Sequence, residues 1–309
     1  MKLLLIGAGS VGAYFCGRAA SGGAAVEVAV HSGYDEILSG GYVIESIAGD
    51  FSFCPVRVLR EVRDVSADID AVVLATKVLP EIDRIKLLDV AANLPSHPPI
   101  MLIQNGIGIE DEIKNAFPQN PLISAIAYIG ASRKTVNHIV HTGAGRLIIG
   151  EFNGNSGAAE ILAEVFRKGG VPCEVSQDIV LERWRKLLWN LPFNTVSVLA
   201  GGITTRELCD GGEMEMLCSQ LMDEVIILAN ACGVPLTRQM ADEQIEYTRN
   251  FPAYKTSMLQ DFEAGRRLEV DAIIGNAVEI ANKMNVPVPR IRTCAVLLRE
   301  ADRKKRVGK

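Results

Sequence analysis

The chain has 309 residues, of which 48% are hydrophobic and 22% are charged, and its formal net charge is −5. This length is enough for two domains with cores of their own, and the composition is that of an ordinary globular protein. Because no large basic block is present, the charge pattern does not indicate a nucleic-acid partner. No apolar run reaches the roughly 18–20 residues of a membrane span, so we expect no membrane partner either.

The cysteines and histidines do not indicate a metal site. Seven cysteines are scattered without a C-x-x-C motif, and none of the four histidines is paired at ligand spacing. The short apolar N-terminal stretch runs directly into a glycine motif, which is not typical of a signal peptide. We therefore expect free thiols, a cytoplasmic location and no bound metal.

The first chemical motif lies at the N-terminus. An apolar run over residues 2–6 is followed by the hexapeptide G-A-G-S-V-G and then by helix-forming residues. This is the G-x-G-x-x-G motif in the context that it requires, with a strand before it and a helix after it. We expect a Rossmann-type fold whose pyrophosphate-binding residues are Gly7, Ala8, Gly9, Ser10, Val11 and Gly12.

The end of the second predicted strand bears on the choice of cofactor. The strand covers residues 25–30 and is followed by His31 and Ser32, where an NAD site usually has an acid. Without an acid to repel a 2′-phosphate, and with two side chains that can donate hydrogen bonds to it, NADP(H) is favoured. The alternative is that both are ordinary loop residues.

Two more predicted strands end in polar residues, at Lys77 and at Asn105. Because ligands bind outside the carboxyl ends of parallel strands, both residues are expected at the cofactor crevice. After them, residues 122–129, 134–141 and 145–150 resemble successive strands without intervening helices, which predicts an antiparallel extension of the sheet.

The second half of the chain is predicted to be helical. A helix over residues 158–168 ends at two glycines, residues 171–176 form a short strand or linker, and Asp178 is positioned to cap the next helix. We place the domain boundary here, between residues 1–170 and 171–309. The fold class is thus an α/β Rossmann-type N-terminal domain followed by an all-α C-terminal domain.

A narrow polar stripe stands out in the helix that contains W-R-K-L-L-W-N-L-P-F-N. Lys186, Asn190 and Asn194 are four residues apart, so they lie on one face, between apolar neighbours such as Trp189 and Phe193. A solvated face would be broader and richer in mixed charge. The stripe therefore indicates polar groups that face a pocket. The alternative is a solvated lysine and two asparagines that bond to loops.

Taken together, these motifs resemble the ketopantoate reductase (2-dehydropantoate 2-reductase) family. The resemblance runs from Gly7 to about residue 290. It rests on the glycine loop, T-K at 76–77, Q-N-G at 104–106, the W-R-K-x-x-x-N-x-x-x-N helix, and T-S-M-L-Q-D at 256–261 followed by Glu269.

The resemblance implies an NADPH-dependent reduction of a 2-oxo acid that is held between the domains. It assigns Lys186 as the acid that protonates the forming alkoxide, and Glu269 as the residue that holds Lys186 and borders the cofactor. A homodimer of this chain is possible as well. The remaining assignments of the resemblance are substrate contacts for Asn190, Asn194, Ser257 and Asn105, and cofactor contacts for Lys77 and Asn105.

The chain departs from the family pattern at two positions. His31 stands where members often carry arginine, and no asparagine precedes Glu207-Leu208. Reduction of another branched 2-oxo acid, or NADP(H) sensing without catalysis, are therefore alternatives. Two site residues also have structural alternatives. Ser257 and Gln260 have capping-box spacing, so Ser257 could start a helix, and Glu269 could form an exposed ion pair with Arg266 or Arg267.

Overall fold

The computed structural model describes residues 1–307, and the chain divides into two compact units. The first contains residues 1–105 and 109–179, and the second contains residues 106–108 and those from 180 onward. The boundary at residue 179 differs from our placement at residue 170 because the strand formed by Cys173–Val175 pairs with a strand of the first unit. Residues 106–108 join the helical unit through hydrogen bonds of Ile107, whose N–H donates to the Ala272 carbonyl (3.0 Å).

A ten-stranded sheet forms the centre of the first unit. Its strands are β1 (Lys2–Ile6), β2 (Ala25–Ala29), β3 (Tyr42–Ser46), β4 (Phe51–Phe53), β5 (Arg57–Leu59), β6 (Ala71–Leu74), β7 (Ile100–Ile103), β8 (Leu122–Thr135), β9 (His138–Glu151) and β10 (Cys173–Val175). Its helices are α1 (Ser10–Ser21), α2 (Tyr34–Gly40), the 3-10 helix η1 (Val62–Asp64), α3 (Arg84–Asn93), α4 (Asp111–Ala116) and α5 (Ala158–Lys168).

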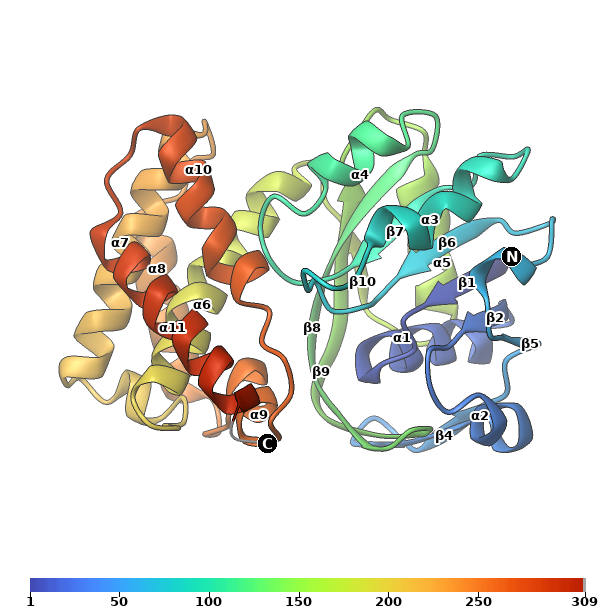
Figure 1. Cartoon of the computed structure of the whole chain (residues 1–309), viewed down its shortest axis with the longest axis horizontal. Helices are drawn as coiled ribbons and strands as arrows, with labels where there is room; N and C mark the ends of the chain where they lie inside the picture. The colour runs from blue at the N-terminus through green and yellow to red at the C-terminus, as the bar shows by residue number, and fades with distance from the viewer. Residues whose placement is uncertain (308–309) are drawn as a thin grey trace. The chain divides into compact units, whose positions relative to one another are not determined.

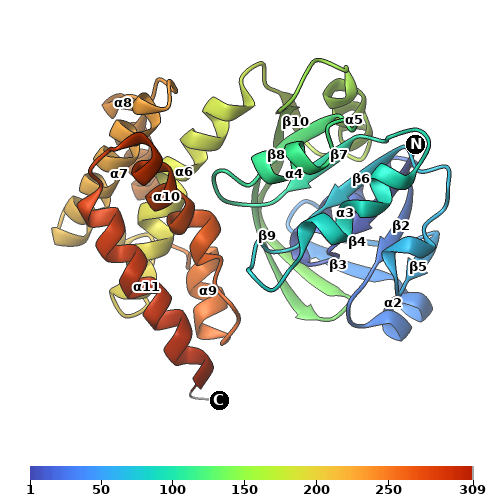
Figure 2. The same cartoon turned by 45° about the horizontal axis from the view of Figure 1, so that its top comes forward.

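The strand order is β4-β3-β9-β8-β7-β6-β1-β2-β5, and the neighbours from β8 to β5 are all parallel. The tenth strand, β10, lies outside this order and pairs with β9. Successive side chains of a strand point to opposite faces. In β1, Leu3 and Leu5 therefore pack with α1 and α5, whereas Leu4 and Ile6 pack with α3 and α4. Figure 1 shows α1 and α3 on opposite faces of these strands, and Figure 2 shows α3 and α4 together on the face turned toward the viewer. Two apolar layers cover the sheet, as expected for a parallel arrangement.

The antiparallel extension is confirmed, but the prediction of three strands in it is wrong. Residues 134–141 are not a separate strand: β8 and β9 form one long hairpin whose turn lies at Val136 and Asn137. The apolar alternation breaks in this region because the hairpin leaves the core there and becomes exposed. Register shifts at three points along the pair allow the hairpin to bend.

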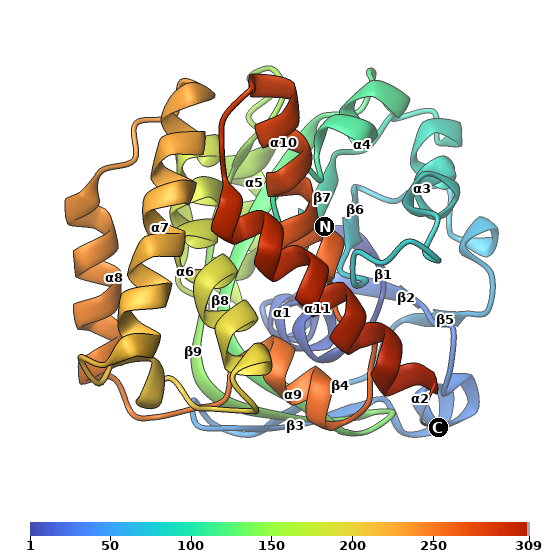
Figure 3. The same ribbon diagram turned by 60° about the vertical axis from the view of Figure 1, so that its left-hand side comes forward.

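The second unit is helical. Its elements are α6 (Ile179–Leu199), the 3-10 helix η2 (Glu207–Cys209), α7 (Glu213–Ala231), α8 (Arg238–Asn250), α9 (Ser257–Glu263), the π-helix η3 (Asp271–Gly275), α10 (Asn276–Met284) and α11 (Pro289–Val307). One apolar cluster that includes Leu188 and Leu191 of α6 forms its core. Figure 3 shows α7 between α8 and α11.

A buried carboxylate fixes the start of α11. Glu224 of α7 is 4% exposed and accepts the backbone N–H groups of Arg290 (3.0 Å) and Ile291 (2.9 Å). The N–H groups of a first helical turn have no partner within the helix, and the helix dipole favours a negative charge beside them. Glu224 therefore caps a helix that is far away in the sequence and ties it to α7.

We predict that Glu224→Ala lowers the free energy of unfolding by about 2 kcal/mol, because it leaves buried N–H groups without an acceptor. Urea unfolding followed by circular dichroism measures this loss. Glu243→Ala, which removes an exposed carboxylate from α8, serves as the control and should change stability little. Equal stabilities of the two variants would contradict the capping role of Glu224.

Candidate functional site

The glycine loop between β1 and α1 packs tightly against the end of β6. Gly7 has a φ of +90°, and a Cβ at this position would lie 2.5 Å from the Thr76 backbone nitrogen. A Cβ at Gly12 would lie 2.7 Å from the Gly7 carbonyl oxygen and 2.9 Å from the Ala75 Cβ. Larger residues at either position would push α1 away from the sheet. Gly7 thus permits the turn, and Gly12 permits the close packing of α1 on the sheet.

Gly9 differs from its neighbours because the space beside it is open. Within residues 1–307, and apart from the neighbouring backbone, a Cβ built at this position would have one atom within 4 Å, an Arg133 side-chain nitrogen at 3.9 Å. Gly9 is the N-cap of α1; no side chain caps the helix, and its first turn carries no acid. The N–H groups of Ser10 and Val11 in the first turn therefore remain available for an anion. These residues fit the pyrophosphate of a dinucleotide.

The ends of β6 and β7 are joined at the same edge of the sheet. The Gln104 amide donates to the Thr76 carbonyl (2.7 Å) and to its hydroxyl (3.1 Å). Lys77 and Asn105 directly follow these two residues, and both are half-buried. The structure thus brings Lys77, Asn105 and the glycine loop to one edge of the first unit, where the sequence predicted a cofactor crevice.

No acidic side chain directly follows β2, where an NAD site usually has an acid that binds the ribose. His31 and Ser32 follow the strand and are exposed. Asp35 lies in the first turn of α2, but it pairs with Arg60 (3.0 Å), whose guanidinium lies 3.7 Å from the centre of the Tyr34 ring. The acid nearest to the strand end is therefore engaged by a cation.

Sequence reasoning missed one cation in this unit, Arg133. Its side chain comes from β8 and donates a hydrogen bond to the Ala8 carbonyl (2.8 Å). In the sequence Arg133 precedes another basic residue and has no motif around it, so only the pairing of the hairpin reveals its place. A cation thus lies on the glycine loop itself.

The polar stripe of α6 is mainly buried in the second unit. Asn190 is 7% exposed and Asn194 is 1% exposed, while Lys186 is half-buried. The rings of Trp189 and Phe193 stack beside the stripe with centroids 4.9 Å apart. The two asparagines are therefore not a solvated face, but the alternative in which an asparagine bonds to a neighbouring backbone holds for Asn194, which accepts the Met258 N–H.

The two asparagines differ in their bonding. The Asn194 amide oxygen accepts the Met258 backbone N–H (3.1 Å) and the Ser257 hydroxyl (3.4 Å). Among the residues that the structure describes, nothing forms a hydrogen bond with the Asn190 amide. The Asn190 amide atoms are not among the fully buried unpaired atoms of the described residues, so they reach solvent and have bonding capacity left for a ligand.

The structural alternative for Ser257 holds only in part, because Ser257 begins α9 but Thr256 is the residue that caps it. The Thr256 hydroxyl accepts the Leu259 backbone N–H (3.2 Å) and is bonded to the Ser197 hydroxyl (2.8 Å). Ser257 is the first helical residue, and its hydroxyl points to Asn194. Two of the four residues that the resemblance assigns to the substrate, Ser257 and Asn194, therefore meet within the second unit.

Glu269 lies between α9 and the π-helix η3 and is half-buried. Of the basic residues before it, Arg266 pairs with Asp261 (2.7 Å) and Arg267 with Asp302 (3.3 Å). Single turns of π-helix occur often at functional sites, so the segment fits a role for Glu269. Its contact with Lys186 stays a prediction.

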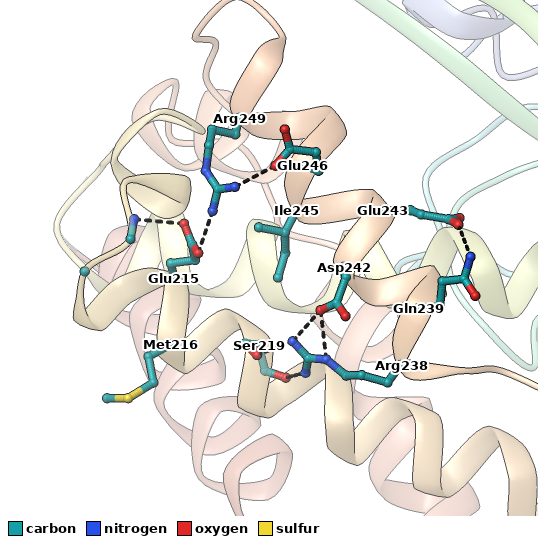
Figure 4. A pocket seen from close by; sticks show the side chains of 12 residues that line it. Glu215, Met216, Ser219, Arg238, Gln239, Asp242, Glu243, Ile245, Glu246 and Arg249 are labelled. Carbon is teal, nitrogen blue, oxygen red and sulfur yellow. Dashed lines mark hydrogen bonds and ion pairs between the residues drawn. The ribbon is translucent and has the colours of Figure 1, made fainter.

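A hollow of about 690 Å³ between α7 and α8 contains none of the predicted residues. Figure 4 shows that its charged side chains point at one another: Arg249 pairs with Glu215 and Glu246, both at 2.7 Å, and Arg238 pairs with Asp242 at 2.8 Å. The lining carries four carboxylates and two guanidinium groups, which form ion pairs at an open surface, and we assign the hollow no part in the candidate site.

Residues 1–307 contain neither a membrane-spanning helix nor a cluster of metal-binding side chains. Within this range, no helix is both long and apolar enough to cross a membrane. No group of three or more histidine, cysteine or acidic side chains in the same range could hold a metal ion. All seven cysteines are free thiols.

Comparison with known proteins places this geometry in a family. The family model described as ketopantoate reductase PanE/ApbA matches residues 3–154, and its C-terminal counterpart matches residues 178–302. A 2-dehydropantoate 2-reductase from Nostoc sp. is 29% identical, over 99% of this chain and 97% of its own.

Solved structures with a similar fold support the same family. The crystal structure of 2-dehydropantoate 2-reductase from Methylococcus capsulatus is 34% identical, with a TM-score of 0.92 over 99% of this chain and 98% of that one. A ternary structure of D-mandelate dehydrogenase with NADH and anilino(oxo)acetate has a TM-score of 0.87 over 99% of this chain and all (100%) of that one, but at 20% identity it shows only a shared fold. The chain therefore belongs to the ketopantoate reductase family of oxidoreductases.

Proposed function

We propose that the protein catalyses the NADPH-dependent reduction of 2-dehydropantoate to pantoate in pantothenate and coenzyme A biosynthesis, in the cytoplasm. The observation that carries the proposal is the stripe of α6, where the unbonded Asn190 amide lies one helical turn from both Lys186 and the Asn194–Ser257 pair. NADP(H) binding alone would require only the first unit. The homodimer stays a prediction that sedimentation velocity can test.

NADPH, when bound, supplies a hydride to the 2-oxo carbon, and the protein must manage the charge that develops on the substrate oxygen. Lys186 stabilises this charge and donates the proton, because a positioned cation interacts more strongly with the transition state than with the ketone. Glu269 holds Lys186 in place. Asn190 orients the substrate oxygens, and Ser257, fixed by Asn194, binds the carboxylate.

A second candidate, reduction of another branched 2-oxo acid, is supported by an aromatic group next to the stripe. The Tyr254 ring stacks on Trp189 with centroids 6.2 Å apart, and Phe251 meets Tyr254 edge to face at 5.9 Å. The Tyr254 backbone exchanges hydrogen bonds with Thr205, so the ring is held in place. Such a wall suits an apolar substrate branch.

One assay separates the candidates. Loss of NADPH absorbance is followed with 2-dehydropantoate and with a panel of other branched and unbranched 2-oxo acids. The highest kcat/KM with 2-dehydropantoate supports the first candidate, and a higher value with another acid supports the second. Binding of NADPH without turnover of any acid would instead indicate a sensing protein.

We predict that the wild-type protein prefers NADPH to NADH, and that His31→Asp shifts the ratio of kcat/KM values toward NADH by about tenfold or more. A carboxylate here repels a 2′-phosphate and accepts a hydrogen bond from a 2′-hydroxyl. Leu38→Asp adds the same charge on the exposed side of α2 and should leave the ratio unchanged. Equal use of both cofactors by the wild type would refute our interpretation of the strand end.

We predict that Ser257→Ala raises KM for the 2-oxo acid, while the Kd for NADPH and the thermal midpoint stay nearly constant. The comparison variant is Thr256→Ala, which removes the helix cap and should lower the midpoint instead. If Ser257→Ala lowers the midpoint and leaves KM unaltered, its hydroxyl supports the helix and not the substrate.

We predict that Lys186→Ala lowers kcat by at least roughly 10²-fold, or on the order of 3 kcal/mol, with NADPH binding intact. Lys186→Gln should restore little, because an amide is not an acid. The matched control is Arg185→Ala, which removes a neighbouring cation that pairs with Glu182 (2.9 Å). Retention of more than about a tenth of kcat, with chemistry shown to limit the rate, would exclude Lys186 from the mechanism.

A further inference from the structure

Arg133 is a cation placed against the glycine loop without an acidic partner. It donates one hydrogen bond, to the Ala8 carbonyl (2.8 Å), and among residues 1–307 no carboxylate pairs with it. A guanidinium has five N–H donors, so most of them are left unused by this contact. Arg133 and Arg60 are both exposed, but Arg60 is engaged by Asp35 and by the Tyr34 ring.

The surroundings of Arg133 are positive as well. Its side chain lies beside Gly9, the N-cap of α1, where the helix dipole places partial positive charge. The first turn of α1 has no acid, and no side chain caps it. A cation next to a positive helix end is unfavourable unless an anion joins them. The charge distribution is therefore complementary to a bound phosphate.

We propose that Arg133 binds a phosphate group of the dinucleotide, an inference that rests on the proposed function and names a further cofactor-binding residue. Its nearness to Gly9 points to the pyrophosphate, which approaches the backbone at this glycine. The same hairpin also reaches the loop after β2, where Val136 leaves no room for a side chain at Gly33. The 2′-phosphate of NADPH is therefore the second phosphate group within reach of this hairpin and of Arg133.

The decisive measurement is the Kd for NADPH and for NADH by calorimetry, without substrate, at low and at high salt. Arg133→Ala should weaken binding roughly tenfold to a hundredfold, as expected for a charge-assisted hydrogen bond, and the loss should shrink at high salt. Arg133→Gln keeps a donor for the Ala8 carbonyl but removes the charge, so it separates phosphate binding from anchoring of the hairpin.

The matched control is Lys134→Ala. Lys134 is the next residue of β8, and its charge is already engaged by Glu45 (3.1 Å). This variant removes the same charge from the same hairpin, and its Kd values should equal those of the wild type. Thermal midpoints of all variants show whether the fold is retained.

Equal losses for NADPH and NADH in the Arg133 variants support binding to the pyrophosphate, and a loss confined to NADPH supports binding to the 2′-phosphate. Wild-type Kd values in Arg133→Gln would overturn the proposal and leave Arg133 as a structural tie. If the wild-type protein bound neither dinucleotide, both the proposed function and the role of Arg133 would fail. Failure of the Arg133 proposal alone is therefore distinguishable from failure of the proposed function.

Discussion

The first unit depends on a close approach of α1 to the sheet that only glycine allows. Gly7 turns the chain beside Thr76, and Gly12 lets the helix pack onto the turn and onto Ala75. Any Cβ at these positions would move the N-terminus of α1 away from the strand ends. The free N–H groups of α1 and the residues after β6 share one edge because this packing is tight.

The charge at the sheet edge beside the glycine loop follows from the absence of acids at two places and from the presence of Arg133. The first turn of α1 has no acid, the end of β2 has none in the ribose position, and Asp35 is paired with Arg60. Arg133 adds a cation to an already positive helix end. All these features favour polyanionic ligands, and they make the affinity for a dinucleotide sensitive to salt.

In the second unit, buried hydrogen bonds hold the stripe of α6 in register with α9. Thr256 links α9 to Ser197, and Asn194 accepts from Ser257 and Met258. These bonds engage the Asn194 amide oxygen, whereas within residues 1–307 no group forms a hydrogen bond with the Asn190 amide. Two residues of identical chemistry, one helical turn apart, thus differ in bonding because their neighbours differ.

The sequence by itself determined the fold class, the glycine loop, the polar strand ends and the stripe of α6. Each rests on local periodicity or on a motif within about a dozen residues, which the chain carries wherever it folds. Tertiary structure decided the rest: the single hairpin of β8 and β9, the place of β10 in the sheet, the cap at Thr256 and the position of Arg133. These features depend on pairing between distant segments, and a side chain such as Arg133 has no local signal because its partner lies 125 residues away.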